Sequence, residues 1–391
     1  MTGAEALDAA LEPRPLFRGP LANQRPRIVR TFGSDPWLVL AVAALVSLGT
    51  VMVFNVSYFP GGDDFGDPLH FFRRHLISIA AGLGLCVITM RMGSDRFRAL
   101  AYPLLVVAVL AMILVLIPGV GTVRSGARRW LPLGPLTFQP SELAKFALVL
   151  YLARSLARRG ERVREFWHGI VPHCIVVGML AALCLLEPDF GTVALWGILL
   201  VLMLFAAGAR LTHLGLFAAA AAPALMAIAI TAPYRMKRLT SFLDCKQDAL
   251  RDGFQLCQAL IAFGSGGVSG VGLGQGQQKM YYLPAAHTDF IFSVIGEELG
   301  LVGAGVVLAL FALVAFRGLR IAARHPDEFG SLLAFGLTTL IVVQGLLNFG
   351  VALGALPTKG LTLPFVSYGG SAMMVSLAEL GALMALARES G

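Results

Sequence analysis

The chain has 391 residues, of which 57% are hydrophobic and 14% are charged, and its mean hydropathy is +0.76. Soluble domains have about 45–50% apolar and about 25% charged residues, so this composition excludes an ordinary soluble protein and indicates an integral membrane protein. The net charge of +8 does not predict a nucleic-acid ligand, because basic residues are not interleaved with aromatic ones. The five cysteines form no CxxC pair and no zinc-like spacing with histidine.

Residues 1–35 are polar and rich in proline and carry five arginines. Such a composition predicts a flexible cytoplasmic tail rather than a folded domain. A cleaved signal peptide is the alternative. The basic region is too long for one, however, and residues 37–57 are 21 uncharged residues, enough to span the hydrocarbon core at about 1.5 Å per residue.

Ten apolar segments together predict an all-α polytopic membrane protein with about ten transmembrane helices. Residues 36–388 are expected to form one transmembrane domain, with a connecting loop at 118–140 and a large extracytoplasmic loop at 233–289. The expected spans are 37–57, 75–90, 100–117, 141 to the basic cluster that starts at Arg154, 168–186, 190–207, 213–232, 290–317, 331–349 and 371–387.

Lysine and arginine are distributed unequally between the two sides of this topology. The side of the N-terminus carries 18 of them and the opposite side 12, of which half lie in the long 233–289 loop. Long loops carry little weight in the positive-inside rule. We therefore expect both termini in the cytoplasm and the start of the 290–317 span on the outer side.

Asp289 is the most distinctive carboxylate, because it follows His287 and Thr288 immediately before an apolar span. A carboxylate where a polar loop meets a membrane segment can act as a general base. The alternative is structural, since Thr288 and Asp289 also resemble a helix N-cap. A packed or hydrogen-bonding role is favoured for His287 over proton transfer.

Several further charged residues fall inside or next to apolar spans. Glu142 and Lys145 are three residues apart, so they share a helix face and can pair, either as a structural pair or as a functional one. Asp189, in the turn between two spans, is expected to cap the following helix or to contact Lys145. Other intramembrane carboxylates must be protonated or paired; they are Glu297, Glu298 and Glu379.

Five motifs in order give the chain a resemblance to the shape, elongation, division and sporulation (SEDS) family of cell-wall polymerases. Together they cover nearly the whole membrane region. Thr358 and Lys359 resemble the division members of the family more than its elongation members. The motifs are GARRWLPLG (126–134), QPSELAK (139–145), EPDFG (187–191), QKMYYLPAAHTDFIFSVIGEELG (278–300) and LPTKGLTLPFVSYGGS (356–371).

The resemblance implies a SEDS-type fold and a peptidoglycan glycosyltransferase that polymerises lipid II outside the cytoplasmic membrane, at the division septum. The family's essential aspartate falls on Asp289. Relatives commonly have a glutamate where this chain has Ala285, so a second outer carboxylate is missing here. The implied partners are lipid II, the growing glycan strand, a class B transpeptidase (a penicillin-binding protein), division regulators and membrane lipids.

The leaving group of this reaction is undecaprenyl pyrophosphate, whose charge cations can stabilise. Lys359, Arg128 and Arg129 are candidates, as is a divalent cation, Mg²⁺ or Mn²⁺, although no cofactor is certain. Each arginine is equally well explained as an interfacial anchor. The other residues expected at the substrate are Trp130, for which an interfacial position is favoured, His287, Thr288, Ser367 and Ser371.

Three alternatives to a division polymerase remain from the sequence. The first is a flippase or transporter of a lipid-linked sugar, which buried charges would also suit, and the second is the elongation polymerase of the same family. The third is a non-enzymatic scaffold. Cys245 and Cys257 lie in the outward loop and can form a disulfide, although Cys257 also fits the apolar face of a short interfacial helix.

Overall fold

The computed structural model describes residues 35–124, 127–134, 136–217, 219, 223, 242, 253–280, 283–284, 286–358 and 360–390. Several expectations fall outside these residues. They are the tail at 1–34, most of the span at 213–232, the first part of the large loop, Cys245, Ala285 and Lys359.

Long α-helices dominate the described residues, and two short helical turns, η1 and η2, connect α5 to α6. The helices are α2 (Pro36–Phe65), α3 (His70–Met90), α4 (Ser94–Leu116), α5 (Pro140–Arg159), η1 (Gly160–Arg164), η2 (Phe166–Ile170), α6 (Val171–Leu186), α7 (Phe190–Ala206), α10 (Phe254–Gly266), α11 (Ile291–Arg324), α12 (Glu328–Ala352) and α13 (Gly370–Ser390).

Seven helical segments in the described part of the chain are long and apolar enough to cross a membrane. They coincide with seven of the expected spans. Two more expected spans are helical as well: α5, which carries a buried ion pair, and α7, which is apolar but only 17 residues long. The fold class, an all-α polytopic membrane protein, is therefore confirmed.

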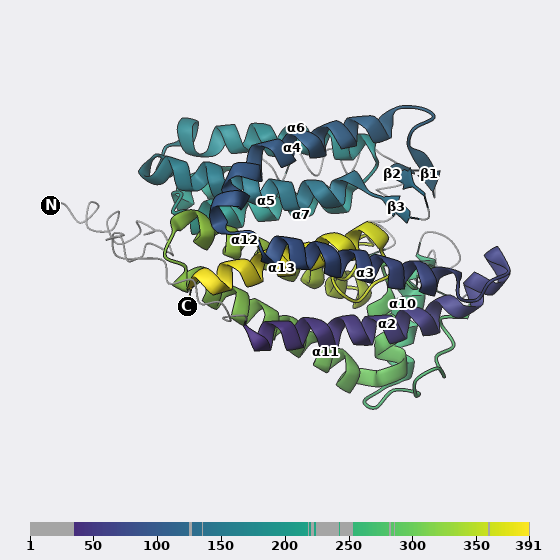
Figure 1. Ribbon diagram of the computed structural model, residues 1–391. Helices are drawn as coiled ribbons and strands as arrows, with labels where there is room; N and C mark the ends of the chain where they lie inside the picture. Colours follow the sequence, from purple (N-terminus) through teal and green to yellow (C-terminus); the bar gives the residue numbers. More distant parts are fainter. Residues whose placement is uncertain are drawn as a thin grey trace.

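The helices form layers (Figure 1). α4, α5, α6 and α7 lie on one side, α2 and α11 on the other, and α3, α12 and α13 between them. α12 and α13 each have 83% of their most apolar window buried, against 22–39% for the other five membrane-length segments. The core is thus built on α12 and α13, and the other five membrane-length segments present apolar faces outward, as helices in contact with lipid do.

A small sheet occupies most of the segment expected to be a loop at 118–140. β1 (Thr122–Arg124), β2 (Ala127–Leu133) and β3 (Leu136–Phe138) pair antiparallel in that order. The hydroxyl of Thr122 also donates to the carbonyl of Trp130 at 3.1 Å. The segment does connect α4 to α5, but the sheet within it was not expected. β1 and β3 have only three residues each, and β2 does not alternate apolar with polar residues, so the strands are defined by their pairing.

Helix α11 is interrupted at Gly300, whose φ of 66° and ψ of −164° are not helical. The segment 267–272 lies against this break, where Leu301 N–H donates to Gly267 O and Gly272 N–H donates to Glu298 O, each at 3.0 Å. A Cβ at Gly300 would lie 2.3 Å from the backbone nitrogen of Gly270. Glycine at position 300 therefore provides both the left-handed φ and the space for this crossing.

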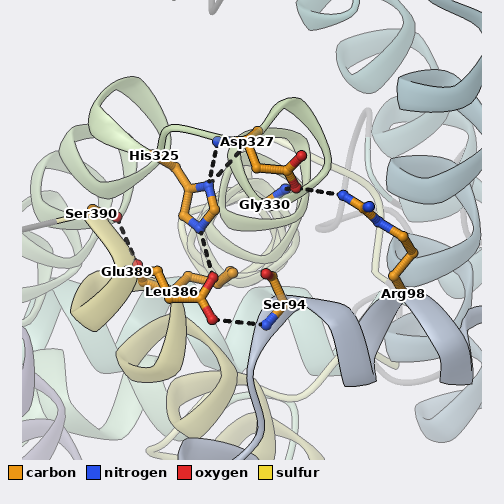
Figure 2. Close-up of polar contacts among 8 residues, drawn as sticks. All are labelled: Ser94, Arg98, His325, Asp327, Gly330, Leu386, Glu389 and Ser390. Carbon is orange, nitrogen blue, oxygen red and sulfur yellow. Dashed lines mark hydrogen bonds and ion pairs between the residues drawn. The ribbon is translucent and has the colours of Figure 1, made fainter. Parts of the chain in front are cut away.

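Polar contacts tie several helix ends together at the end of the molecule where the chain terminates (Figure 2). The Arg98 guanidinium is 2.6 Å from the Asp327 carboxylate, which also caps α12. Glu389 accepts from the Ser94 backbone N–H at 2.9 Å and lies 3.3 Å from His325. The start of α4, the α11–α12 connection and the end of α13 are thereby held together, far along α11 from Asp289.

Candidate active site

The segment that carries Asp289 is held through three consecutive backbone carbonyls. Tyr368 N–H donates to His287 O at 2.9 Å, and the Ser367 hydroxyl donates to Thr288 O at 2.5 Å. The Asp289 carbonyl accepts from the side-chain amide of Asn348 at 2.8 Å. The chain from 287 to 289 is therefore fixed against the segment before α13 and against α12.

Two amide side chains, one turn apart on α12, hold the segment that follows this helix. The Asn348 amide donates to Leu361 O at 2.7 Å as well as to Asp289 O. The Gln344 amide donates to Thr362 O at 2.8 Å. Residues 344 and 348 lie on one face of the helix because they are four apart. This face therefore aligns the Asp289 segment with residues 361–362.

The Asp289 carboxylate lies beside the glycine that follows Lys359. A Cβ built at Gly360 would be 3.4 Å from Asp289 Oδ2, and Asp289 is partly exposed. The N-cap residue of α11 is Phe290, and no side chain caps it. Thr288 and Asp289 directly precede this residue, and a capping role for them stays a prediction.

His287 lies in an aromatic cluster formed by α3 and the segment before α13. Its ring centroid is 5.1 Å from that of Phe71 and 5.6 Å from that of Tyr368. Phe71 and Tyr368 contact each other edge to face at 5.5 Å. This packing agrees with the packed role favoured for His287, and it stiffens the chain before Asp289.

The two serines expected at the substrate make structural contacts. Ser367 Oγ accepts from the Leu363 N–H at 2.8 Å while it donates to Thr288 O. Ser371 Oγ accepts from the backbone N–H of Gln139 at 3.2 Å, which connects the start of α13 to that of α5. Both serines are buried, so their hydroxyls order the backbone around the site.

The two arginines of the GARRWLPLG motif bind backbone carbonyls. Arg128 donates to Leu116 O at 3.1 Å. Arg129 donates to Glu187 O at 2.6 Å and also to Pro188 O. These contacts fasten the small sheet to the end of α4 and to the α6–α7 turn. A substrate contact by either arginine, or by Trp130 in β2, stays a prediction.

Two carboxyl groups of the α6–α7 turn have different surroundings. Asp189 caps α7, because it accepts from the Thr192 N–H at 3.2 Å and the Thr192 hydroxyl at 2.9 Å. Glu187 is buried, and within the described residues its carboxyl oxygens have no hydrogen-bond partner. Burial, reinforced by the Asp189 charge and opposed by Arg129, raises the pKa of Glu187 to about 8.

The predicted pairing of Glu142 with Lys145 is present. Lys145 Nζ lies 2.8 Å from Glu142 Oε2, and both side chains are buried. The same ammonium donates to Gln344 Oε1 at 2.9 Å. The intramembrane ion pair is thus connected through Gln344 to the segment at Thr362.

A second buried ion pair, between Lys279 and Glu298, was not expected. Lys279 Nζ lies 2.8 Å from Glu298 Oε1 and 2.6 Å from Asn55 Oδ1, and the Asn55 amide donates to Glu298 at 2.5 Å. Glu298 also accepts from the Gly274 N–H, and Glu297 accepts from the N–H of Gln277. We call Asn55, Lys279 and Glu298 the loop clasp. The residues before Asp289 are thereby fastened to α11 and α2.

The sequence offered two weak signals for the loop clasp. Glu298 is an intramembrane carboxylate that needs a partner, and Lys279 lies within the 278–300 motif. The two residues are 19 positions apart with an irregular segment between them, so no helical or strand spacing predicts that they meet.

Potential metal ligands do not gather in the described part of the chain, and the cysteines there differ in bonding. No group of three or more His, Cys, Asp or Glu side chains there could hold a metal ion. Cys86, Cys174 and Cys184 are free thiols, whereas Cys257, on α10, is disulfide-bonded. Because Cys245 lies outside the described residues, its pairing with Cys257 stays a prediction.

Known proteins resemble the chain in sequence and in structure. A protein of Geobacter metallireducens named "Probable peptidoglycan glycosyltransferase FtsW" is 41% identical over 350 residues, which cover 90% of this chain and 93% of the relative. A chain of a peptidoglycan synthase complex, described as coordinating polymerization and crosslinking, matches with a TM-score of 0.77 and 34% identity over 92% of this chain and 99% of that one. The rod shape determining protein RodA of Thermus thermophilus gives a TM-score of 0.67 at 31% identity, over 92% and 98% of the two chains.

The family comparison covers nearly the whole region outside the N-terminal tail. The model of the FtsW, RodA and SpoVE family, described as "Cell cycle protein", matches residues 36–391. These residues include the helices, the small sheet, the loop clasp and the Asp289 site. The chain therefore belongs to the FtsW/RodA/SpoVE family of cell cycle proteins.

Proposed function

We propose that the protein is a peptidoglycan glycosyltransferase that polymerises lipid II, with Asp289 as the general base. The observation that carries this assignment is the fixed Asp289 segment, whose three carbonyls are all bound while its carboxylate is partly exposed beside Gly360. A base must be held in a defined position to be effective. The peptidoglycan glycosyltransferase name of the Geobacter relative supports this reaction.

The proposed step transfers a glycosyl group from a lipid carrier to a sugar hydroxyl. The acceptor oxygen attacks the anomeric carbon of the donor, and the bond from that carbon to the pyrophosphate oxygen breaks. The hydroxyl proton passes to the Asp289 carboxylate, and undecaprenyl pyrophosphate leaves with its negative charge. A site at the membrane–water interface suits a substrate with an isoprenoid chain in lipid and sugars in water.

The developing charge on the pyrophosphate needs a cation. Lys359 is the preferred protein group, because its sequence neighbour Gly360 lies beside Asp289. Arg128 and Arg129 are weaker candidates, since both already donate to backbone carbonyls. A divalent cation, Mg²⁺ or Mn²⁺, could supply the same stabilisation when bound.

The proposed orientation places both termini in the cytoplasm and Asp289 on the outer side. The excess of lysine and arginine on the side of the termini supports this orientation. Asp289 precedes α11 and the polar contacts around His325 follow it, so the two lie at opposite ends of this helix. Residues 1–35 are proposed as a flexible tail and 36–388 as one transmembrane domain.

A division role and a transpeptidase partner complete the proposal. The FtsW name of the Geobacter relative and the Thr358-Lys359 pair favour septal synthesis over elongation. The related chain that belongs to a peptidoglycan synthase complex supports a partner that crosslinks the product strands, a class B penicillin-binding protein. Division regulators are proposed as further partners.

Purified protein with its cognate transpeptidase, given labelled lipid II, tests the reaction class. The proposal predicts a ladder of glycan strands from this mixture. A parallel sample in proteoliposomes measures movement of labelled lipid II between leaflets, the activity expected of the alternative flippase, for which the buried Glu142–Lys145 pair would be suited. Transport without any ladder would overturn the proposal.

A further inference from the structure

We infer that Asn348 is a positioning residue for Asp289, and that Gln344 supports it through the neighbouring backbone. This inference rests on the proposed function. The geometry gives each amide a defined set of partners, and the two sets meet at residues 361 and 362. Neither side chain touches reacting atoms in this account, since both act on the backbone.

The orientation of the Asn348 amide follows from its partners. Its nitrogen lies 2.8 Å from Asp289 O and 2.7 Å from Leu361 O, and both of these atoms are acceptors. An amide oxygen in that place would face two carbonyls, so the NH₂ group must occupy it. One buried side chain therefore uses both of its N–H groups to connect the Asp289 segment with the segment that follows α12.

Asn348 is also held in a rigid place. It is buried near the C-terminal end of α12, between the buried residues Leu347 and Phe349. Phe349, the next residue, packs against Phe292 with ring centroids 4.5 Å apart. The amide is thus presented from a fixed helix, which is how a supporting residue controls the position of a functional group.

Gln344 extends this arrangement to the intramembrane charges. Its oxygen accepts from Lys145 at 2.9 Å and its nitrogen donates to Thr362 O at 2.8 Å. The Lys145 ammonium fixes the orientation of the amide, because it can only donate. The Glu142–Lys145 pair therefore acts through Gln344 on the residue next to Leu361, and it contacts Asp289 only indirectly.

Replacing Asn348 with leucine removes both hydrogen bonds while it keeps a buried side chain of similar size. We expect kcat for lipid II polymerisation to fall by about 100-fold, the loss typical of a displacement of about 1 Å in a reacting group. The KM for lipid II and the amount of lipid II bound per protein should stay within about threefold of the wild-type values, because Asp289 is assigned to the chemical step. Gln344→Leu should reduce kcat less, by about tenfold.

Two variants keep the test decisive. Thr338→Val is the matched control, because Thr338 is buried on the same helix and its hydroxyl binds only Ala334 O, at 2.7 Å, among the described residues; it should leave kcat unchanged. Asn348→Asp keeps the shape of the side chain and, when protonated, can restore one of the two hydrogen bonds. Its kcat should lie between those of the wild type and Asn348→Leu, and it replaces the leucine variant if that one does not fold.

The outcomes separate this inference from the proposed function. If bound lipid II falls in the same proportion as kcat, Asn348 is merely structural and the inference is wrong. An unchanged kcat in Asn348→Leu also overturns it, provided that the wild type polymerises lipid II and Asp289→Asn does not. If the wild type makes no strands, or Asp289→Asn still does, the proposed function fails instead.

Discussion

The two buried lysine–glutamate pairs have the same geometry but very different separations in the chain. Lys145 and Glu142 lie on one turn of α5, with charged atoms 2.8 Å apart. Lys279 and Glu298 are also 2.8 Å apart, but Lys279 belongs to an irregular segment and Glu298 to α11. The first pair can form whenever α5 is helical, whereas the second forms only after the segment before Asp289 has folded onto α11.

The difference indicates which pair stabilises the tertiary structure. Loss of the Lys279 charge releases an irregular segment that is held mainly by the loop clasp and by backbone contacts to Glu297. Loss of the Lys145 charge leaves α5 in place, because this helix is buried along most of its length. We therefore expect Lys279 to matter most for stability and Lys145 to matter more for the alignment of Gln344.

Lys279→Met should give the largest loss of stability. Glu298 is fully buried, and removing one partner of a buried ion pair typically costs about 3–5 kcal/mol. Chemical or thermal unfolding of the purified protein in detergent measures the loss. The double variant Lys279→Met/Glu298→Gln should recover part of it. A loss below about 1 kcal/mol would mean that the pair contributes little.

Lys145→Met should cost less, about 1–3 kcal/mol, the usual penalty for an unsatisfied buried polar group. The Glu142 side chain is 10% exposed, so water can still reach its carboxylate once its partner is gone. The same unfolding measurement, beside Lys279→Met, compares the two pairs directly. A larger loss for Lys145→Met than for Lys279→Met would reverse the comparison.

Glu187 extends the comparison to a buried carboxyl without a hydrogen-bonded cation among the described residues. Its pKa is raised from 4.5 to about 8, so the folded state holds the proton more tightly than the unfolded state does. The resulting stabilisation is complete below about pH 4.5 and is lost as the pH rises through about 8, at up to about 1.4 kcal/mol per pH unit. Glu187→Gln should remove this contribution to the pH dependence of the free energy of unfolding, measured between about pH 5 and about pH 8. Equal pH dependences for the wild type and the variant would contradict the raised pKa of Glu187.

Arg73→Ala should have the smallest effect. Its ion pair with Asp67 spans 3.1 Å, but the two side chains are 65% and 37% exposed, and exposed pairs contribute below about 1 kcal/mol. Unfolding at low and at high salt provides the measurement, because screening should weaken even this contribution. A loss as large as that of Lys145→Met would show that exposure does not separate these pairs.

Most of the helical architecture could be predicted from the sequence, because a long apolar run predicts a membrane-spanning helix without information from other segments. The Glu142–Lys145 pair was equally accessible, since its spacing of three residues is local. The sheet was missed because two of its strands have three residues each, the third shows no alternating pattern, and all of them depend on pairing with one another. The α11 break at Gly300 was missed because a single glycine inside a helical pattern does not by itself predict where the helix is interrupted.

The site was predicted where its motif is local and missed where it is tertiary. Asp289 was singled out from its place before a span, and its catalytic role stays a prediction, whereas the packed role of His287 agrees with its aromatic neighbours. Asn348 and Gln344 gave no signal, since buried amides on an apolar helix reveal nothing of the carbonyls that they bind. The carbonyl contacts of Arg128 and Arg129 were likewise invisible, because they join distant segments.

The most direct test of the central claim is polymerisation of labelled lipid II by the Asp289→Asn variant. The variant is purified with its cognate transpeptidase and compared with the wild type at equal amounts of folded complex. The account predicts glycan ladders from the wild type and none from the variant, with the complex still intact. Ladders of comparable length and rate from Asp289→Asn would contradict the assignment of Asp289 as the general base.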